Sequence, residues 1–462
     1  MELNEHVERL QEPLVHALQE LLRYPSVRGE ATPRCPFGSE VGKTLESALA
    51  IAGNLGFRTA NLDGYVGYAE WGEGEEYVAV LGHLDVVPAG EGWSHPPFGG
   101  EIHQEKLYGR GTLDDKGPIL AALFGLKAVA QSGLPLSRRV RVIFGTCEET
   151  TWEDIPYYLE RELLPVLGFT PDGNFPLIHA EKGHLAFDFV GEQGSEAGRP
   201  VLRSLQGGQV ANMVPPSAQA ILQGISTEEI VDALALYNRA HGSQIDAIPE
   251  GQDTLLRSAG VAAHAALPHL GRNAIMQLVG FLDTLGLQPS GAAAFLSFLQ
   301  ETIGMETDGK SLGLACSDPV SGALTLNVGV IHSTEQELRV RVDIRYPISA
   351  RSDDLLGILR HQVEGRGLKL ECSRITEPLH VALDDPLVTA LQRVYEAQTG
   401  LEGKPLAIGG RTYASAMPHV VAFGPLFPGD PDLDHQVDEC ISLDNLRRLT
   451  SIYAQAILEL AR

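Results

Sequence analysis

The sequence is short of cysteine and of long apolar runs, and each shortage excludes a class of protein. Its five cysteines lie far apart and form no C-x-x-C pair, which argues against a disulfide framework and for a reducing compartment. No apolar run approaches the ~20 residues of a membrane-spanning helix. The charged segment 1–22 also lacks the apolar stretch of a signal peptide. These features predict a soluble, cytoplasmic protein.

Basic side chains are also few relative to acidic ones. The 462 residues include 35 lysines and arginines against 60 acids, which gives a net charge of −25. Such a charge repels phosphate backbones and anionic lipid, so we expect neither nucleic acid nor membrane as a partner. A hydrophobic content of 44% with 21% charged residues excludes a disordered or fibrous chain. The length predicts two or three domains.

Short strands that alternate with helices predict an α/β domain. Residues 77–81 and 140–144 are apolar runs rich in β-forming residues, and 119–131 between them has helical periodicity. A first helix is expected over 14–22, before Pro25. This order is typical of a mostly parallel sheet with helices on both faces.

The pattern changes over residues 184–376. Alternating segments at 324–328 and 338–342 predict half-buried antiparallel strands, with a helix at 227–241. The α/β pattern then returns, with helices expected at 386–398 and 443–460. The sequence therefore predicts a discontinuous α/β domain, 1–183 and 377–462, interrupted by an α+β domain over 184–376.

Five clusters of acids and histidines follow predicted strands or lie in loops. They are His83-Leu84-Asp85, Asp114-Asp115, Cys147-Glu148-Glu149, Pro171-Asp172-Gly173 and Asp434-His435. Each alone has an ordinary reading, such as an acidic helix N-terminus, a turn or a surface histidine. Together, at the carboxyl ends of parallel strands, they indicate a ligand site. Two histidines with several carboxylates suit Zn²⁺, with Mn²⁺ or Co²⁺ as alternatives, and a carboxylate shared by two cations is typical of a two-metal hydrolase.

The order of these motifs carries a resemblance. The segments GHLDVVPAGEGW, GRGTLDDKGP, TCEET, GFTPDGNFPLIHAEKG and DHQVDE occur in this order along the chain. The series resembles the dinuclear zinc peptidases that include aminoacylase, carboxypeptidase G and the PepV-type dipeptidases, and it is most similar to the PepV type. The resemblance extends over nearly the whole chain, and it implies that the 184–376 insertion is an enlarged lid domain of a monomer.

The resemblance implies a role for each motif residue. One divalent metal ion would be bound by His83 and Asp172, the other by Glu149 and His435, with Asp114 bridging both. Asp85 would support His83, and Glu148 would be the general base that takes a proton from the water bridging the ions. In the insertion, His264 resembles the residue that polarises the scissile carbonyl and stabilises the oxyanion.

The resemblance also implies substrate contacts. These would be Asn212, Arg345 and the loop residues Gly409, Gly410, Arg411 and Thr412. An arginine can hold a substrate carboxylate in two parallel hydrogen bonds. Arg411 stands where the family commonly has a glycine and Ser415 where it commonly has a basic residue, so substrate preference stays open.

These features predict a metal-dependent dipeptidase that acts on dipeptides or short peptides. An N-acyl-amino-acid deacylase or desuccinylase would share every metal residue and is the nearest alternative. An inactive metal-binding scaffold homologue is a further alternative, but all five ligands and the base are present in this sequence.

Overall fold

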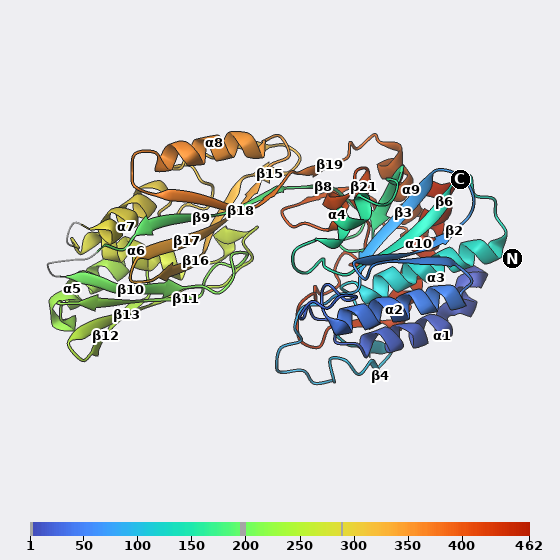
Figure 1. The fold of residues 1–462 in the computed structure, drawn as a ribbon, viewed down its shortest axis with the longest axis horizontal. Helices are drawn as coiled ribbons and strands as arrows, with labels where there is room; N and C mark the ends of the chain where they lie inside the picture. Colours follow the sequence, from blue (N-terminus) through green and yellow to red (C-terminus); the bar gives the residue numbers. More distant parts are fainter. Residues whose placement is uncertain (1–2, 195–199, 288–289) are drawn as a thin grey trace. The chain divides into compact units, whose positions relative to one another are not determined.

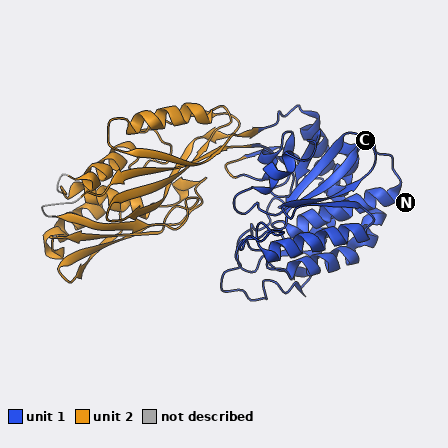
Figure 2. Ribbon diagram, viewed as in Figure 1, with its two compact units in different colours: residues 1–180, 380–407, 411–462 blue, residues 181–379, 408–410 orange. Residues whose placement is uncertain are grey.

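The computed structural model describes residues 3–194, 200–287 and 290–462, and the chain divides into two compact units. Figure 1 shows the fold and Figure 2 the units. Unit 1 comprises residues 1–180, 380–407 and 411–462, and unit 2 comprises 181–379 and 408–410. Unit 1 is built on an α/β pattern and unit 2 on an α+β pattern, which confirms the predicted fold class.

Unit 1 is organised around a nine-stranded sheet. Its elements are α1 (Leu3–Leu22), α2 (Ser39–Asn54), β1 (Arg58–Leu62), β2 (Val66–Trp71), β3 (Tyr77–His83), β4 (Glu101–His103), β5 (Lys106–Tyr108), α3 (Lys116–Ser132), β6 (Arg139–Gly145), α4 (Asp154–Leu159), β7 (Leu167–Thr170), β8 (Ile178–Glu181), β19 (Leu379–His380), α9 (Pro386–Thr399), β20 (Leu406–Ile408), the 3₁₀ helix η2 (Tyr413–Ala416), β21 (Val420–Ala422), β22 (Cys440–Ser442) and α10 (Leu443–Ala461). The strand order is β1-β2-β6-β3-β7-β21-β8-β19, with β20 paired to β8. The centre, β6-β3-β7-β21, is parallel, whereas β1, β2 and β8 pair antiparallel at the edges.

The register of the parallel strands brings their carboxyl ends to one edge of the sheet. His83 at the end of β3 pairs with Gly145 at the end of β6, and Val80 pairs with Phe169 in β7. Both β3 and β6 are buried almost throughout, as expected for parallel strands covered on both faces. The predicted motifs that follow these strands are therefore brought side by side.

Helices cover both faces of this sheet. On one face, Gly67 and Gly82 approach side chains of α2 and α3, and α10 packs beside α3. On the other face, Arg141 of β6 donates to Tyr158 of α4, and Gly145 approaches Tyr413 of η2.

Helix α1 is longer than the sequence predicted. It begins at Leu3 and continues through Pro13, whereas we expected a start at residue 14. Val7 and Leu10 are buried in the same stripe as Leu14, so burial of this apolar face outweighs the backbone hydrogen bond that proline removes. Among the described residues, no helix has the combination of length and apolarity that crossing a membrane requires.

Unit 2 is a two-layer structure with a wholly antiparallel main sheet. Its elements are β9 (Gly183–Glu192), β10 (Val201–Gly207), β11 (Ser217–Gln223), α5 (Thr227–His241), β12 (Ile245–Glu250), β13 (Asp253–Ala259), η1 (Pro268–Leu270), α6 (Ala274–Thr284), α7 (Gly291–Thr302), β14 (Ser317–Asp318), β15 (Gly322–Ala323), β16 (Thr325–Ser333), β17 (Glu337–Tyr346), α8 (Ser352–Val363) and β18 (Lys369–Thr376). The order is β12-β13-β11-β10-β16-β17-β9-β18. One apolar core unites the four helices with one face of the sheet. The other face carries ion pairs such as that of Asp188 with Arg339 and Arg341.

Helices α3 and α10 approach closely at one glycine. A Cβ atom on Gly125 would lie 2.9 Å from the backbone nitrogen of Ala454 and 3.2 Å from the carbonyl oxygen of Thr450. Backbone atoms cannot move aside as a flexible side chain can. Gly125 therefore sets the spacing of these two helices behind the sheet.

We predict that Gly125→Ala lowers the free energy of unfolding by about 1–3 kcal/mol, because the added methyl group separates α3 from α10. Urea denaturation followed by circular dichroism measures this loss. Gly53→Ala in α2 is the control, since a Cβ atom added there would meet no other atom within 4 Å, and we expect a gain of about 0.5–1 kcal/mol. Equal effects of both substitutions would contradict the close-packing argument.

Candidate metal centre

The five predicted metal ligands all lie in unit 1, at the carboxyl edge of its sheet. His83 ends β3, Glu149 follows β6, and Asp172 follows β7. Asp114 lies just before α3, and His435 lies in the loop that leads to β22. The chain thus brings together residues that are up to several hundred positions apart.

Asp114 lies between the two histidines. Its Oδ1 is 2.9 Å from Nε2 of His83, and its Oδ2 is 3.0 Å from Nε2 of His435. Asp172 lies 3.9 Å from the same His83 nitrogen, and Glu149 lies 3.1 Å from the same His435 nitrogen. Two groups result, each with ligand atoms within 4.8 Å of one another, and Asp114 belongs to both.

The tautomer of His83 is fixed by its other ring nitrogen. Nδ1 lies 3.0 Å from the backbone oxygen of Asp85, which can only accept, so Nδ1 carries the hydrogen. Nε2 then presents a lone pair, and within the described part of the chain this buried atom has no hydrogen-bond partner in good geometry. A metal-binding histidine is oriented in this way. The Asp85 carboxylate lies 3.5 Å from Nδ1, farther than the Asp85 carbonyl.

Negative charge is concentrated between the histidines. Burial opposes the ionisation of Asp114, but the hydrogen bond from His435 and the charge of His83 in its protonated form hold the pKa of the Asp114 carboxyl well below its usual range. The same bond from His435 to Asp114, with a second to Glu149, raises the pKa of His435 to about 11. Burial, followed by the charge of Asp114, raises the pKa of Glu149 to about 7. The cluster therefore favours added positive charge.

These residues fit a pair of divalent cations. Two ligands at about 2.0–2.1 Å from one tetrahedral ion lie roughly 3.3 Å apart, and the separations above, 2.9–3.9 Å, bracket that value. Three carboxylates and two imidazoles form the donor set, which suits Zn²⁺ and also Mn²⁺ or Co²⁺. A shared carboxylate with one histidine and one acid on each side matches the arrangement of two-metal hydrolases.

Backbone amides hold the turn that carries Glu148 and Glu149. Their N–H groups donate to the two oxygens of Asp85, at 3.1 Å each. The preceding N–H groups of Thr146 and Cys147 donate to Asp154, at 2.7 and 3.1 Å. Asp85 therefore supports the glutamates more directly than it supports His83.

Glu439 holds the loop that carries Asp114, a role that the sequence did not reveal. Its buried carboxylate accepts from Arg110 at 2.7 Å and from the backbone N–H groups of Gly111, Leu113 and Asp114 at 3.0, 2.8 and 3.3 Å. Its place in the DHQVDE segment was the available signal. The same segment thus supplies both a candidate ligand and the support of the shared one.

Comparison with known proteins identifies the family. The family model described as peptidase family M20/M25/M40 matches residues 79–459. The chain belongs to this family. A Bacillus subtilis (strain 168) protein named "Putative dipeptidase YtjP" is 42% identical over 460 residues, 98% of each chain. A Staphylococcus haemolyticus (strain JCSC1435) protein named "Putative dipeptidase SH1171" is 35% identical over 99% of this chain and 98% of its own.

A solved structure of another protein has the same fold as this M20-family chain. Aminoacylhistidine dipeptidase from Vibrio alginolyticus superimposes with a TM-score of 0.59 at 15% identity, over 97% of this chain and 96% of its own. The predicted resemblance is confirmed, and the chain is a metallopeptidase of family M20.

Two predicted substrate contacts of this M20 peptidase, Asn212 and Gly409, and the predicted catalytic residue His264 lie near one another in unit 2. Met213, next to Asn212, forms a bridge with His264, and the backbone N–H of Ala265 donates to the Asn212 carbonyl. A Cβ atom on Gly409 would lie 3.0 Å from that of Ala266. Asn212 and His264 are exposed, and Nδ1 of His264 accepts from the N–H of Ala266.

Arg345 is already bound within unit 2. Its guanidinium donates through Nε and Nη2 to the two oxygens of Asp343, at 2.8 and 3.2 Å, and Asp343 also lies 2.8 Å from Nε2 of His184. Two of its five N–H groups are therefore used, which leaves the Nη1 side for another acceptor.

The remaining loop residues have local structural contacts. Arg411 lies over the Trp152 ring, 4.1 Å from its centroid. The Thr412 hydroxyl accepts from the N–H of Ala414 and caps η2, and Ser415 donates back to the Thr412 carbonyl. Gly410 shares this loop. Arg411 and Ser415 depart from the family pattern. The loop that contains them is held in place by hydrogen bonds within the loop and by the cation–π contact of Arg411 with Trp152.

We predict that Glu439→Gln lowers the free energy of unfolding by about 3–5 kcal/mol, because the amide leaves the buried Arg110 charge unpaired. Urea denaturation measures the loss, and metal analysis should show a lower metal content because the Asp114 loop loses its support. Asp438→Asn, one residue earlier, is the control, since Asp438 bonds Ser94 at an exposed position. Comparable losses in both variants would contradict the role of Glu439.

Proposed function

We propose that this M20 peptidase is a dipeptidase that works with two divalent cations, Zn²⁺ being favoured over Mn²⁺ and Co²⁺. His83 and Asp172 would hold one cation, Glu149 and His435 the other, and Asp114 both. The observation that carries this proposal is that the two oxygens of Asp114 face two imidazoles, 2.9 and 3.0 Å away. When bound, the two cations would lower the pKa of a shared water molecule and polarise the scissile carbonyl.

Glu148 is the general base in this proposal. Burial raises the pKa of its carboxyl well above the usual value, and the charges of Asp172, Glu149 and Asp114 act in the same direction, although His83 opposes them. A general base works best when its pKa is near the working pH. The Glu148 carbonyl accepts from the Trp152 indole at 2.6 Å, and its N–H donates to Asp85, so the backbone of this residue is fixed on both sides. Glu148 would take a proton from the attacking water and pass it to the leaving amine.

The substrate class follows from the relatives and from the residues of unit 2. The similar Bacillus and Staphylococcus proteins are designated dipeptidases. His264 would polarise the scissile carbonyl and stabilise the oxyanion, and Asn212 would contact the substrate. Arg345, with the Asp343 bond fixing its plane, would present its remaining N–H groups to the substrate carboxylate. A cytoplasmic location and a monomeric state stay predictions.

An N-acyl-amino-acid deacylase would use the same metal ligands and base. The two activities differ in whether the substrate has a free amino end. An inactive scaffold is disfavoured because it would not need the Glu148 carboxyl, whose pKa burial raises, beside the metal ligands.

We predict that the Zn²⁺-loaded enzyme hydrolyses free dipeptides at least about tenfold faster, by kcat/KM, than N-acetyl or N-succinyl amino acids, since binding of the free ends accounts for the difference. Amidated dipeptides test whether the free carboxylate is required. Removal of metal with a chelator should abolish turnover, and Zn²⁺, Mn²⁺ or Co²⁺ should restore it. Faster turnover of N-acyl amino acids would assign the deacylase activity instead.

We predict that Glu148→Gln lowers kcat by about 10²–10⁴-fold, because a glutamine cannot accept the proton, while metal content stays at two ions. Steady-state kinetics and elemental analysis measure the two quantities. Glu153→Gln, an exposed glutamate of the same loop, is the matched control and should keep near wild-type kcat. Retention of full activity by Glu148→Gln would show that another group is the base.

A further inference from the structure

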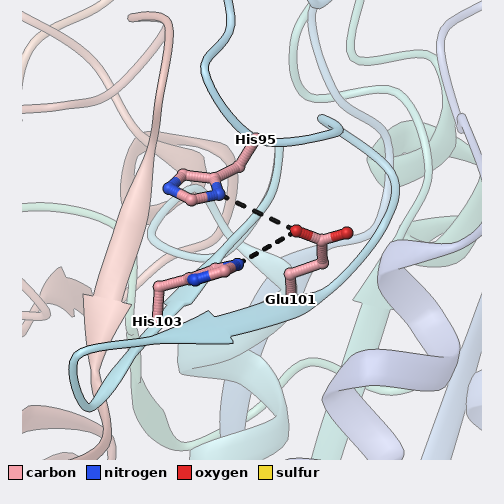
Figure 3. Close-up of side chains that lie close together, drawn as sticks. All are labelled: His95, Glu101 and His103. Atoms are coloured by element: carbon pink, nitrogen blue, oxygen red, sulfur yellow. Dashed lines mark hydrogen bonds and ion pairs between the residues drawn. The ribbon is translucent and has the colours of Figure 1, made fainter.

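A second cluster of metal-binding side chains lies outside the candidate metal centre. His95, Glu101 and His103, here called the surface triad, each offer one ligand atom, and these atoms lie within 4.8 Å of one another. Figure 3 shows the two imidazoles next to each other on one side of the Glu101 carboxylate, with both contacts converging on one oxygen. None of these residues belongs to the predicted catalytic set.

The separations in the surface triad suit one cation. Oε2 of Glu101 lies 3.1 Å from Nε2 of His103 and 3.7 Å from Nδ1 of His95. Ligands on one tetrahedral ion lie roughly 3.3 Å apart, so small side-chain movements are enough to place all three on an ion. The side chains of Glu101 and His103 are 45% and 50% exposed, which gives an ion access and leaves room for water ligands.

Local structure holds these side chains in place. Glu101 and His103 are two apart on β4 and so share one face. Strand β4 pairs with β5, and the Tyr108 ring on β5 lies against the His95 ring, with centroids 4.1 Å apart. The His95 loop is anchored one residue earlier, where Ser94 donates to Asp438 through its backbone N–H at 2.7 Å and its hydroxyl at 2.8 Å.

A histidine beside a glutamate is common on protein surfaces and needs no metal. His361 and Glu364 on α8 are such a pair in this chain, 3.4 Å apart. The surface triad differs because a second imidazole faces the same carboxylate oxygen, with the two rings 4.2 Å apart. Two imidazoles with one carboxylate is a donor set that binds Zn²⁺, Ni²⁺ and Cu²⁺.

We propose that the surface triad is an additional binding site for a divalent transition-metal cation, Zn²⁺, Ni²⁺ or Cu²⁺, with His95, Glu101 and His103 as its protein ligands. This site is independent of the proposed peptidase mechanism. Because first-row affinity rises towards Cu²⁺, copper is the most sensitive probe.

The experiment titrates Cu²⁺ into full-length protein that holds two equivalents of Zn²⁺, the number that the catalytic centre would take, and compares wild type with the variant His95→Ala/His103→Ala. We expect wild type to bind one more equivalent of Cu²⁺ than the variant, with a paramagnetic resonance spectrum that shows nitrogen coupling from two imidazoles. The variant should lose more affinity than the roughly 10–100-fold that removal of an outer-shell partner costs.

Two further variants complete the test. Glu101→Gln should weaken binding while both imidazoles still couple to copper, and His361→Ala should bind as wild type does. The difference between wild type and the double variant is insensitive to copper that exchanges into the catalytic centre, because both proteins contain that centre. Equal copper equivalents in the two proteins, or a spectrum without coupling from two imidazoles, would overturn the proposal.

Discussion

The contact of one carboxylate with two imidazoles is the constraint on which the rest of the candidate metal centre depends. Asp114 is 8% exposed and has further acids around it, so its negative charge is costly unless positive charge lies close by. His83 and His435 provide that charge when protonated, and two cations would provide it in the proposed enzyme. The loop that carries Asp114 must therefore hold a charge in a costly position, and Glu439 fixes it through backbone N–H groups and Arg110.

Backbone amides stabilise the supporting acids throughout this region. Asp85 and Asp154 accept four consecutive N–H groups after β6, and Glu439 accepts three in the Asp114 loop. Hydrogen bonds to an ionised carboxylate are stronger than those between neutral groups. The amide bonds offset only part of the effect of burial, which raises the pKa of Asp154 to about 6 and also raises that of Glu439. The proposed ligands Asp114 and Glu149 instead direct their oxygens at the histidines.

Family membership and substrate preference rest on different parts of the molecule. The M20 assignment comes from a match across residues 79–459 and from relatives that are 35–42% identical over nearly the whole chain. Substrate preference depends on a few side chains, and some of these are engaged by their own chain. Arg345 is bound to Asp343, and Arg411 lies over Trp152. Whatever ligand they contact must fit around these bonds.

The sequence by itself determined the fold class and the chemical type of the site. Apolar strands at 77–81 and 140–144, and helices such as 227–241, are local patterns, and they appear as β3, β6 and α5. Local patterns do not distinguish adjacent residues of the same type. The family resemblance assigned the shared ligand to Asp114, and the tertiary structure shows the contacts that separate it from Asp115. Asp114 faces the histidines, whereas Asp115 lies beneath β3 and accepts the N–H of His83. The support by Glu439 and the surface triad likewise depend on contacts between distant segments, because side-chain position is set by how strands pair and loops pack, and local sequence does not record it.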